Sequence, residues 1–161
     1  RCAPGKFVDA KDSIRTFSEV YGREWRICRK EVKMMTKIIE KSIIIHNVPS
    51  EKISVEENTV TIDFDDIYER RHKIQFIPYQ AIKITTADCF RKDVLLTDET
   101  LASGRYQRYI LEIENSQWTD QLKRALKEID ENASFMEHAR HFVLDLGDEI
   151  VEIAASGYAL K

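Results

Sequence analysis

Acidic and imidazole side chains gather near the carboxyl end of the chain, in a pattern that could bind a metal ion or share a proton. His138 and His141 are three residues apart, and Asp145 and Glu152 follow at positions that a β-hairpin would bring to one face with His141. These residue types suit divalent cations and proton transfer near neutral pH. The H-E-x-x-H signature of zinc-binding helices is absent, and a metal site needs ligands that converge. The alternative is a polar strand face exposed to solvent.

A second cluster of charge lies at residues 63–72. Asp63 and Asp65 alternate along an expected strand and so share one face, where carboxylates can hold a hard cation such as Mg²⁺. Arg70, Arg71 and His72 follow at once, and they offer charge compensation without a metal. The two clusters together give the weak candidates for catalytic residues: Asp63, Asp65, His141, Asp145 and Glu152.

Signatures of covalent catalysis and of nucleotide binding do not occur in the sequence. There is no G-x-S-x-G motif, and no recognised motif surrounds Cys89. The five glycines are isolated, so the sequence has no glycine-rich loop of the kind that binds phosphate. We therefore expect no cofactor and no resident metal.

The net charge of −3 hides an asymmetry between two parts of the chain. Residues 1–46 hold 11 Lys and Arg against 6 Asp and Glu (net +5), whereas residues 47–161 hold 14 against 22 (net −8). A basic segment can meet nucleic acid, an acidic partner or the acidic remainder of its own domain. The candidate binding residues, all on one predicted helix, are Arg26, Arg29, Lys30, Lys33 and Lys37. An overall pI near 5.9 makes nucleic acid the weakest of these partners.

The elements that must position these residues begin with a helical segment, which we expect over residues 12–42. Apolar side chains there recur three and four residues apart, the spacing of one buried helix face: Trp25, Cys28, Val32, Met35 and Ile39. From Ile43 onward, β-branched residues and a period of two predict a β-rich region over residues 43–114, with at least four strands. Residues 91–104 lack a clear period and predict an exposed loop.

A second helix and a terminal hairpin complete the predicted elements. Apolar residues from Trp118 to Ile129 step by four, four and three, so we expect a helix over residues 116–131, capped by Asn115 or Ser116. A turn at Gly147-Asp148 closes a hairpin over residues 141–155. Its register places four apolar side chains on one core face: Phe142, Leu144, Val151 and Ile153. The other face carries His141, Asp145 and Glu152 and is expected to meet solvent.

These elements predict a single α+β domain over residues 1–161. A predominantly antiparallel sheet of five to seven strands is packed by the N-terminal helical segment and by the helix before the hairpin. The short connections between strands do not suit a parallel sheet, which needs longer crossovers. The composition, 43% apolar and 33% charged with few Gly and Pro, excludes fibrous and low-complexity proteins. Apolar runs no longer than three residues exclude a membrane-spanning helix.

The lack of catalytic signatures favours a non-enzymatic intracellular protein-binding or interaction module, with a protein partner or self-association. The alternative is a metal-assisted hydrolase that uses the carboxylates and His141. A third possibility is a weak nucleic-acid binder that uses the basic helix. Cys2, Cys28 and Cys89 have no paired spacing, which indicates a reducing compartment and hence the cytoplasm.

Overall fold

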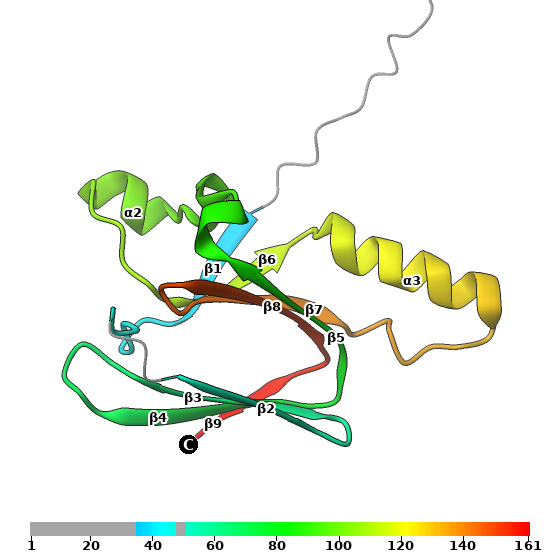
Figure 1. Ribbon diagram of the computed structural model, residues 1–161. Helices are drawn as coiled ribbons and strands as arrows, with labels where there is room; N and C mark the ends of the chain where they lie inside the picture. Colours follow the sequence, from blue (N-terminus) through cyan, green and yellow to red (C-terminus); the bar gives the residue numbers. More distant parts are fainter. Residues whose placement is uncertain (1–34, 48–50) are drawn as a thin grey trace, which may run out of the picture. The chain divides into compact units, whose positions relative to one another are not determined.

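The computed structural model describes residues 35–47 and 51–161, which form two antiparallel sheets (Figure 1). The first has five strands in the order β1-β6-β7-β8-β5, with the bounds Met35–Glu40, Ile110–Glu114, Arg140–Asp145, Glu149–Ala155 and Tyr79–Thr86. The second has four strands in the order β2-β3-β4-β9, with the bounds Lys52–Glu56, Thr59–Asp65, Arg71–Phe76 and Tyr158–Leu160. The antiparallel pairing is as predicted, but the prediction of one sheet of five to seven strands is wrong.

The two sheets pack face to face because each has one apolar face to bury. On β3, Val60, Ile62 and Phe64 alternate inward with at most 1% exposure, as the period of two in the sequence predicts. They share one core with apolar side chains of β6, β7 and β8. The Phe76 and Phe142 rings, from opposite sheets, lie 5.1 Å apart between centroids. The sequence predicted that helices cover the apolar face of the sheet, whereas in the structure the second sheet covers it.

Residues 35–40 form the edge strand β1, so the predicted helix does not extend to residue 42. β1 pairs with β6, and Ile38 faces Leu111 in that register. Ile38 is 8% exposed, whereas Met35, which the helical stripe placed in the core, is 54% exposed. Pairing with β6 outweighs the helical spacing of the apolar residues, because it satisfies the backbone hydrogen bonds of the segment and also buries Ile38. Residues 12–34 of the predicted helical segment lie outside the described residues.

A short extended segment, residues 43–47, connects the two sheets at one end. Ile45 N donates to Arg108 O at 2.7 Å, just before β6, and His46 N donates to Asp65 O at 2.9 Å, at the end of β3. Ile44 O in turn accepts from Ile67 N at 2.9 Å. The segment is thus held by backbone hydrogen bonds on both sides, with Ile43 and Ile45 in the core.

The terminal hairpin has the predicted register, with Phe142 opposite Ile153 and Val143 opposite Glu152. The prediction that its second face meets solvent is wrong. Val143 and Ile150 on that face are fully buried and pack in a second apolar cluster with Leu95. Leu95 comes from residues 91–104, which we expected to be an exposed loop and which contain the 3-10 helix η2 (Lys92–Leu95) and the helix α2 (Asp98–Ser103). The five-stranded sheet is therefore covered on both faces.

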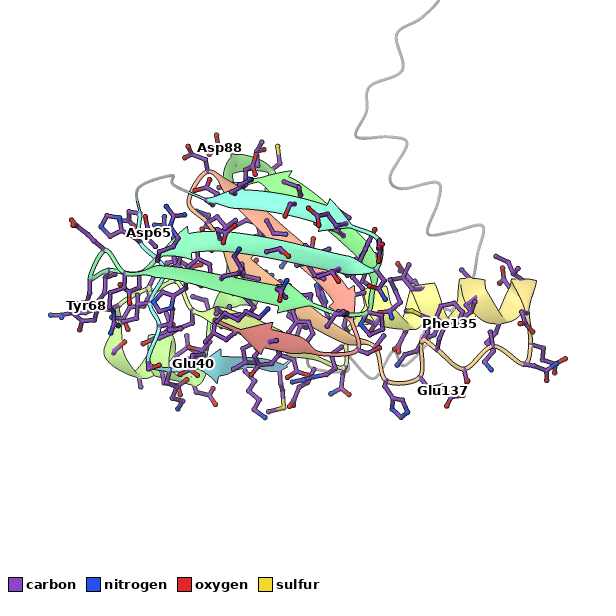
Figure 2. All side chains as sticks on the ribbon, turned by 90° about the horizontal axis from the view of Figure 1, so that it is seen from below. Glu40, Asp65, Tyr68, Asp88, Phe135 and Glu137 are labelled. Atoms are coloured by element: carbon purple, nitrogen blue, oxygen red, sulfur yellow. The ribbon has the colours of Figure 1, made fainter. Side chains whose placement is uncertain are left out.

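Helix α3 (Gln117–Ile129) confirms the helix predicted before the hairpin. It lies on the side of the five-stranded sheet away from the four-stranded sheet (Figure 1). Ser116 caps it, as Oγ accepts from Thr119 N at 3.3 Å. Its apolar stripe is only partly buried by the described residues, because Ile129 is 86% exposed. Phe135 lies beside α3, at the opposite end of the sheets from Tyr68 (Figure 2).

The described residues all belong to one compact unit, residues 33–161. Within them, no helix is long and apolar enough to cross a membrane.

Candidate functional site

The carboxylates Asp63 and Asp65 lie on the outer face of β3 and are both paired with bases of β4. Asp63 Oδ1 is 3.4 Å from Lys73 Nζ, and Asp65 Oδ1 is 2.8 Å from Arg71 Nε. The two acids point away from the sandwich core, because the alternate residues of β3 face inward. Their charges are therefore compensated by cross-strand neighbours.

Asp66, directly after β3, is a buried carboxylate that organises the turn to β4. Its Oδ1 accepts from Tyr68 N at 2.8 Å and Arg70 N at 3.0 Å, and its Oδ2 lies 2.9 Å from His72 Nε2. Burial alone raises the pKa of Asp66, but the hydrogen bonds from Arg70, His72 and the backbone outweigh it and leave the pKa well below its usual range. Asp66 is thus an ionised structural centre of this turn.

His141 and Glu152 are brought together on the outer face of the five-stranded sheet. His141 Nε2 lies 3.2 Å from Glu152 Oε1 but is not aligned for a hydrogen bond. His141 Nδ1 lies 2.8 Å from Ser116 Oγ, and the Trp118 ring meets the imidazole edge-on. The imidazole lowers the pKa of Glu152 against the effect of burial, and Lys83 adds to the lowering.

Three side chains in contact have the residue types of a catalytic triad: Ser116, His141 and Glu152. They pack the start of α3 against β7. Ser116 and His141 are each 4% exposed, and the hydroxyl is engaged as the cap of α3. A nucleophile must reach its substrate, and this hydroxyl is covered. The cluster fixes the start of α3 onto β7. The sequence predicted Asn115 or Ser116 as the cap, and it gave no sign of the contact between Ser116 and His141.

The predicted metal-binding set does not converge. Asp145 and His141 share a face of β7 but are four residues apart, a separation of roughly 13 Å along a strand. Asp63 and Asp65 belong to the other sheet. Within residues 35–47 and 51–161, no group of three or more His, Cys, Asp or Glu side chains could hold a metal ion. His138 is exposed and lies before β7.

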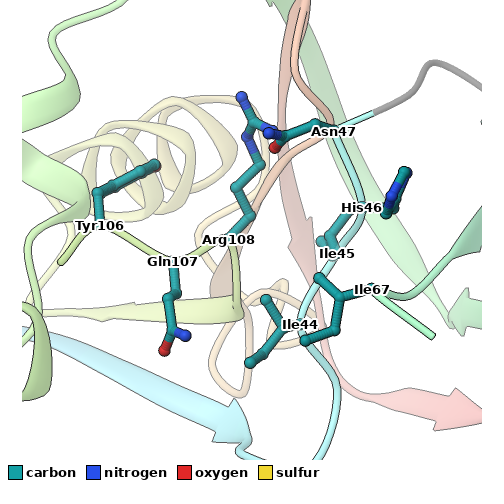
Figure 3. A pocket seen from close by; sticks show the side chains of 8 residues that line it. All are labelled: Ile44, Ile45, His46, Asn47, Ile67, Tyr106, Gln107 and Arg108. Carbon is teal, nitrogen blue, oxygen red and sulfur yellow. The ribbon is translucent and has the colours of Figure 1, made fainter.

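A pocket of about 420 Å³ opens where the segment 43–47 passes the chain before β6 (Figure 3). Three pieces of chain line it, and its lining residues are Ile44, Ile45, His46, Asn47, Ile67, Tyr106, Gln107 and Arg108. The backbone hydrogen bonds described above fix these pieces to one another. Volumes of about 300–1,000 Å³ are typical of small-ligand sites. The pocket is therefore large enough for one ligand group.

Arg108 is the lining residue of this pocket that the buried Asp145 holds in place. Arg108 Nε donates to Asp145 Oδ1 at 3.1 Å, and the side chains are 19% and 1% exposed. Asp145 Oδ2 accepts from Tyr106 Oη at 2.7 Å, and Oδ1 also accepts from Gly147 N at 2.9 Å. Burial and the hydrogen bond to Asp145 raise the pKa of Tyr106, so its hydroxyl stays a donor at neutral pH. All three donors thus converge on one carboxylate.

Arg108 has hydrogen-bonding capacity that the described residues do not use. Its Nη1 is covered and has no partner among them. A buried donor without a partner costs free energy, but an atom as covered as this one is not reached from the pocket. This residue was not among the candidates from the sequence. Its partner Asp145 is 37 positions away, and no local pattern connects the two.

The predicted basic binding face is only partly described. Lys37 lies exposed on the edge strand β1 and not on a helix, so it cannot continue a helical row of bases. Arg26, Arg29, Lys30 and Lys33 lie outside the described residues. Cys89 is free and exposed.

Comparisons of the chain with protein-family models, with curated proteins and with solved structures give no match.

Proposed function

We propose that this domain is a non-enzymatic binding module and that its ligand group enters the pocket at Arg108. The observation that carries the proposal is the Arg108 guanidinium, which a buried carboxylate fixes beside a pocket of about 420 Å³. Ligand sites combine apolar surface with polar groups held in fixed positions, and this pocket has three isoleucines beside five polar residues.

The pocket is preorganised, which supports a binding role. Backbone hydrogen bonds hold Ile45 and Ile67 in place, and Asp145 holds Arg108. A ligand that meets fixed groups loses less free energy to ordering the protein on binding. The rim also has exposed apolar surface, since Ile67 is 42% exposed, Tyr106 41% and Tyr68, next to Ile67, 69%. A partner protein can cover such surface, so a protein partner remains part of the proposal.

Neither alternative has a comparable observation behind it. The residues of the metal-assisted hydrolase are divided between two sheets, and their carboxylates are largely paired with bases. Four of the five basic residues of the nucleic-acid hypothesis lie outside the described residues, and the fifth, Lys37, lies on the edge strand β1. A cytoplasmic location stays a proposal, supported by three cysteines whose odd number and spacing do not suggest a disulfide framework.

Nuclear magnetic resonance tests the binding role with a set of small probes, each with an aliphatic or aromatic group of five to eight heavy atoms and one carbonyl or carboxylate. We expect shifts of backbone amide signals at residues 44–47, 67 and 106–108. Ile67→Trp, which fills the mouth of the pocket, should abolish them. The matched control Ile84→Trp changes an isoleucine of similar exposure, 51%, on β5 and should leave them intact. The proposal is wrong if no probe shifts these signals, or if both variants respond alike.

A further inference from the structure

We infer that the outer edge of β5 pairs with the same edge of a second copy of this chain, so that the two five-stranded sheets join into one. β5 lies at the end of the strand order, and within the described residues it pairs with β8 alone. None of its residues lines the pocket at Arg108. The inference therefore goes beyond the proposed ligand site and does not depend on it.

Alternate backbone groups of β5 point away from the sheet. Ala87 N donates to Asp148 O at 2.8 Å, in continuation of the register between β5 and β8. Such bonds recur at every second residue of an antiparallel pair, so the backbone groups of Thr85 and Lys83 also bond to β8. The residues between them direct their amides and carbonyls to the outer edge: Ile82, Ile84 and Thr86. A second strand there would satisfy these groups.

β5 is the longest and least charged of the four edge strands in the described sheets. Proteins protect sheet edges with short strands and with charged side chains. β1 and β2 each carry two charged residues, and β9 has only three residues, whereas β5 has eight residues with Lys83 as its one charge. Lys83 Nζ lies 3.9 Å from the centroid of the Trp118 ring and 3.8 Å from Glu152 Oε1. The ammonium is therefore turned onto its own molecule and does not guard the edge.

Ile84 adds an apolar contact to this edge. It lies opposite Val151 of β8, whose buried side chain belongs to the core between the two sheets. Side chains of directly opposite residues share one face of a sheet, so Ile84 faces the same side. It is nevertheless 51% exposed. A strand added along β5 would cover this side chain and bury apolar surface.

The sequence of the edge favours a second copy as its partner. In an antiparallel pair of two β5 strands, outward-bonding residues must lie opposite outward-bonding residues. If Ile84 of one copy lies opposite Ile84 of the other, the two side chains cover each other and Lys83 of each copy lies opposite Thr85. If Ile82 lay opposite Ile84 instead, the two Lys83 side chains would be opposite each other, which is destabilising for like charges. The favoured dimer therefore has its twofold axis at Ile84, with the same contacts on both subunits.

Amide hydrogen exchange of the full chain, measured by nuclear magnetic resonance in dilute and in concentrated samples, tests the pairing. Light scattering gives the mass under the same conditions. We expect a concentration-dependent dimer in which the amides of Ile82, Ile84 and Thr86 exchange about tenfold or more slowly than in the monomer. The amides of Lys83 and Thr85, which bond to β8, should be protected in both samples.

Three results of this experiment would overturn the inference. The first is a chain that stays monomeric at every concentration. The second is a dimer in which the three outward amides exchange as fast as in the monomer, because the contact then lies elsewhere. The third is a monomer in which these amides are already protected, because another part of the chain then occupies the edge.

A pair of matched variants locates the contact. Ile84→Lys places two ammonium groups opposite each other at the twofold axis, and it should weaken the dimer by about tenfold or more. Ile129→Lys makes the same change at an isoleucine of α3 that is 86% exposed, and it should leave the dimer unchanged. Thermal unfolding checks that both variants fold, and if Ile84→Lys does not, the exchange pattern of the wild type decides. A dimer that survives Ile84→Lys, or that is lost with Ile129→Lys, uses another surface and contradicts the inference.

Discussion

Arg108 Nε and Asp145 Oδ1 lie 3.1 Å apart although the residues are separated by 37 positions of chain. The contact joins the segment before β6 to the end of β7, at the closed end of the terminal hairpin. The Asp145 carboxylate is buried. In this it differs from the pair of Arg91 and Asp93, whose side chains are 82% and 57% exposed. Burial makes the first pair costly to break, whereas solvent and salt weaken the second.

The first prediction concerns this difference between the two pairs. Asp145→Ala leaves Arg108 without its buried partner, and we expect it to lower the free energy of unfolding by about 3–5 kcal/mol. Asp93→Ala should change it by less than about 1 kcal/mol. Tyr106→Phe, which removes one donor to Asp145, should cost about 1 kcal/mol. Urea denaturation at pH 7 measures all three, and equal losses for Asp145→Ala and Asp93→Ala would contradict the structural role of the buried pair.

The second prediction concerns acid stability and Asp66. Because the pKa of Asp66 is lower in the folded than in the unfolded state, its ionised form stabilises the fold above the unfolded value, about 4. That contribution is lost as the pH falls through the folded pKa. Asp66→Asn should be less stable than wild type by a constant amount between pH 7 and 5, and the difference should shrink below pH 4. Urea denaturation between pH 7 and 3 compares the two. A difference that grows toward low pH has the wrong sign.

The third prediction uses two hairpin turns with the same backbone requirement. Glu57 opens the loop between β2 and β3 with a φ of +49°, and Gly147 opens the loop between β7 and β8 with a φ of +105°. Glycine adopts positive φ without the strain that other residues carry there. Glu57→Gly should therefore raise the free energy of unfolding by about 0.5–1 kcal/mol. For a chain of this size, each kcal/mol raises the melting temperature by about 2–4 °C.

Gly147→Ala is the converse change, and we expect it to cost about 1–2 kcal/mol. An added Cβ there would meet Asn47 O at 3.6 Å, an ordinary contact, so the backbone conformation and not a clash is the cause. Thermal unfolding measures both variants. We expect the melting temperature to rise for Glu57→Gly and to fall for Gly147→Ala. A change in the same direction for both variants would show that the backbone angle φ does not govern the stability of these turns.

The fourth prediction tests whether both faces of the five-stranded sheet are buried. Ile153 faces the four-stranded sheet, and Ile150 faces the cluster around Leu95. Ile153→Ala and Ile150→Ala should each cost about 2–5 kcal/mol, because each leaves a cavity in a closed core. Ile84→Ala, at a half-exposed position of β5, should cost much less. Chemical denaturation compares the three, and a nearly neutral Ile150→Ala would mean that the second face is open to solvent.

The fifth prediction concerns the start of α3. Ser116→Ala removes the acceptor for Thr119 N and the partner of His141 Nδ1, and we expect a loss of about 0.5–2 kcal/mol. Ser116→Thr keeps a hydroxyl in place and should recover most of it. Thermal unfolding of the two variants decides between a capping role and a requirement for serine itself. Equal losses in both would contradict the capping role.

Local patterns predicted the elements whose partners are near in sequence. The hairpin register follows from the glycine turn and the alternation of Phe142 and Leu144, because a two-residue loop leaves only one register that puts these side chains on one face. The helix after Ser116 follows from its cap and its apolar steps. In both cases the deciding interactions lie within about 15 residues.

Positions whose state depends on distant partners could not be predicted in the same way. Met35 and Ile39 fit a helical stripe, yet pairing with β6, more than 70 residues later, makes them part of a strand. His141 and Asp145 looked like solvent-facing polar residues, since nothing near them in sequence shows that η2 and the start of α3 cover that face.

By itself the sequence determined the antiparallel strands, the capped helix and the exact pairing of the last hairpin, since each depends on side-chain period and turn chemistry within a short stretch. Only the tertiary structure decided that the strands divide into two stacked sheets and that Arg108 stands at a pocket held by Asp145. The physical reason is that burial and ion pairing depend on which surfaces meet, and long-range packing sets that.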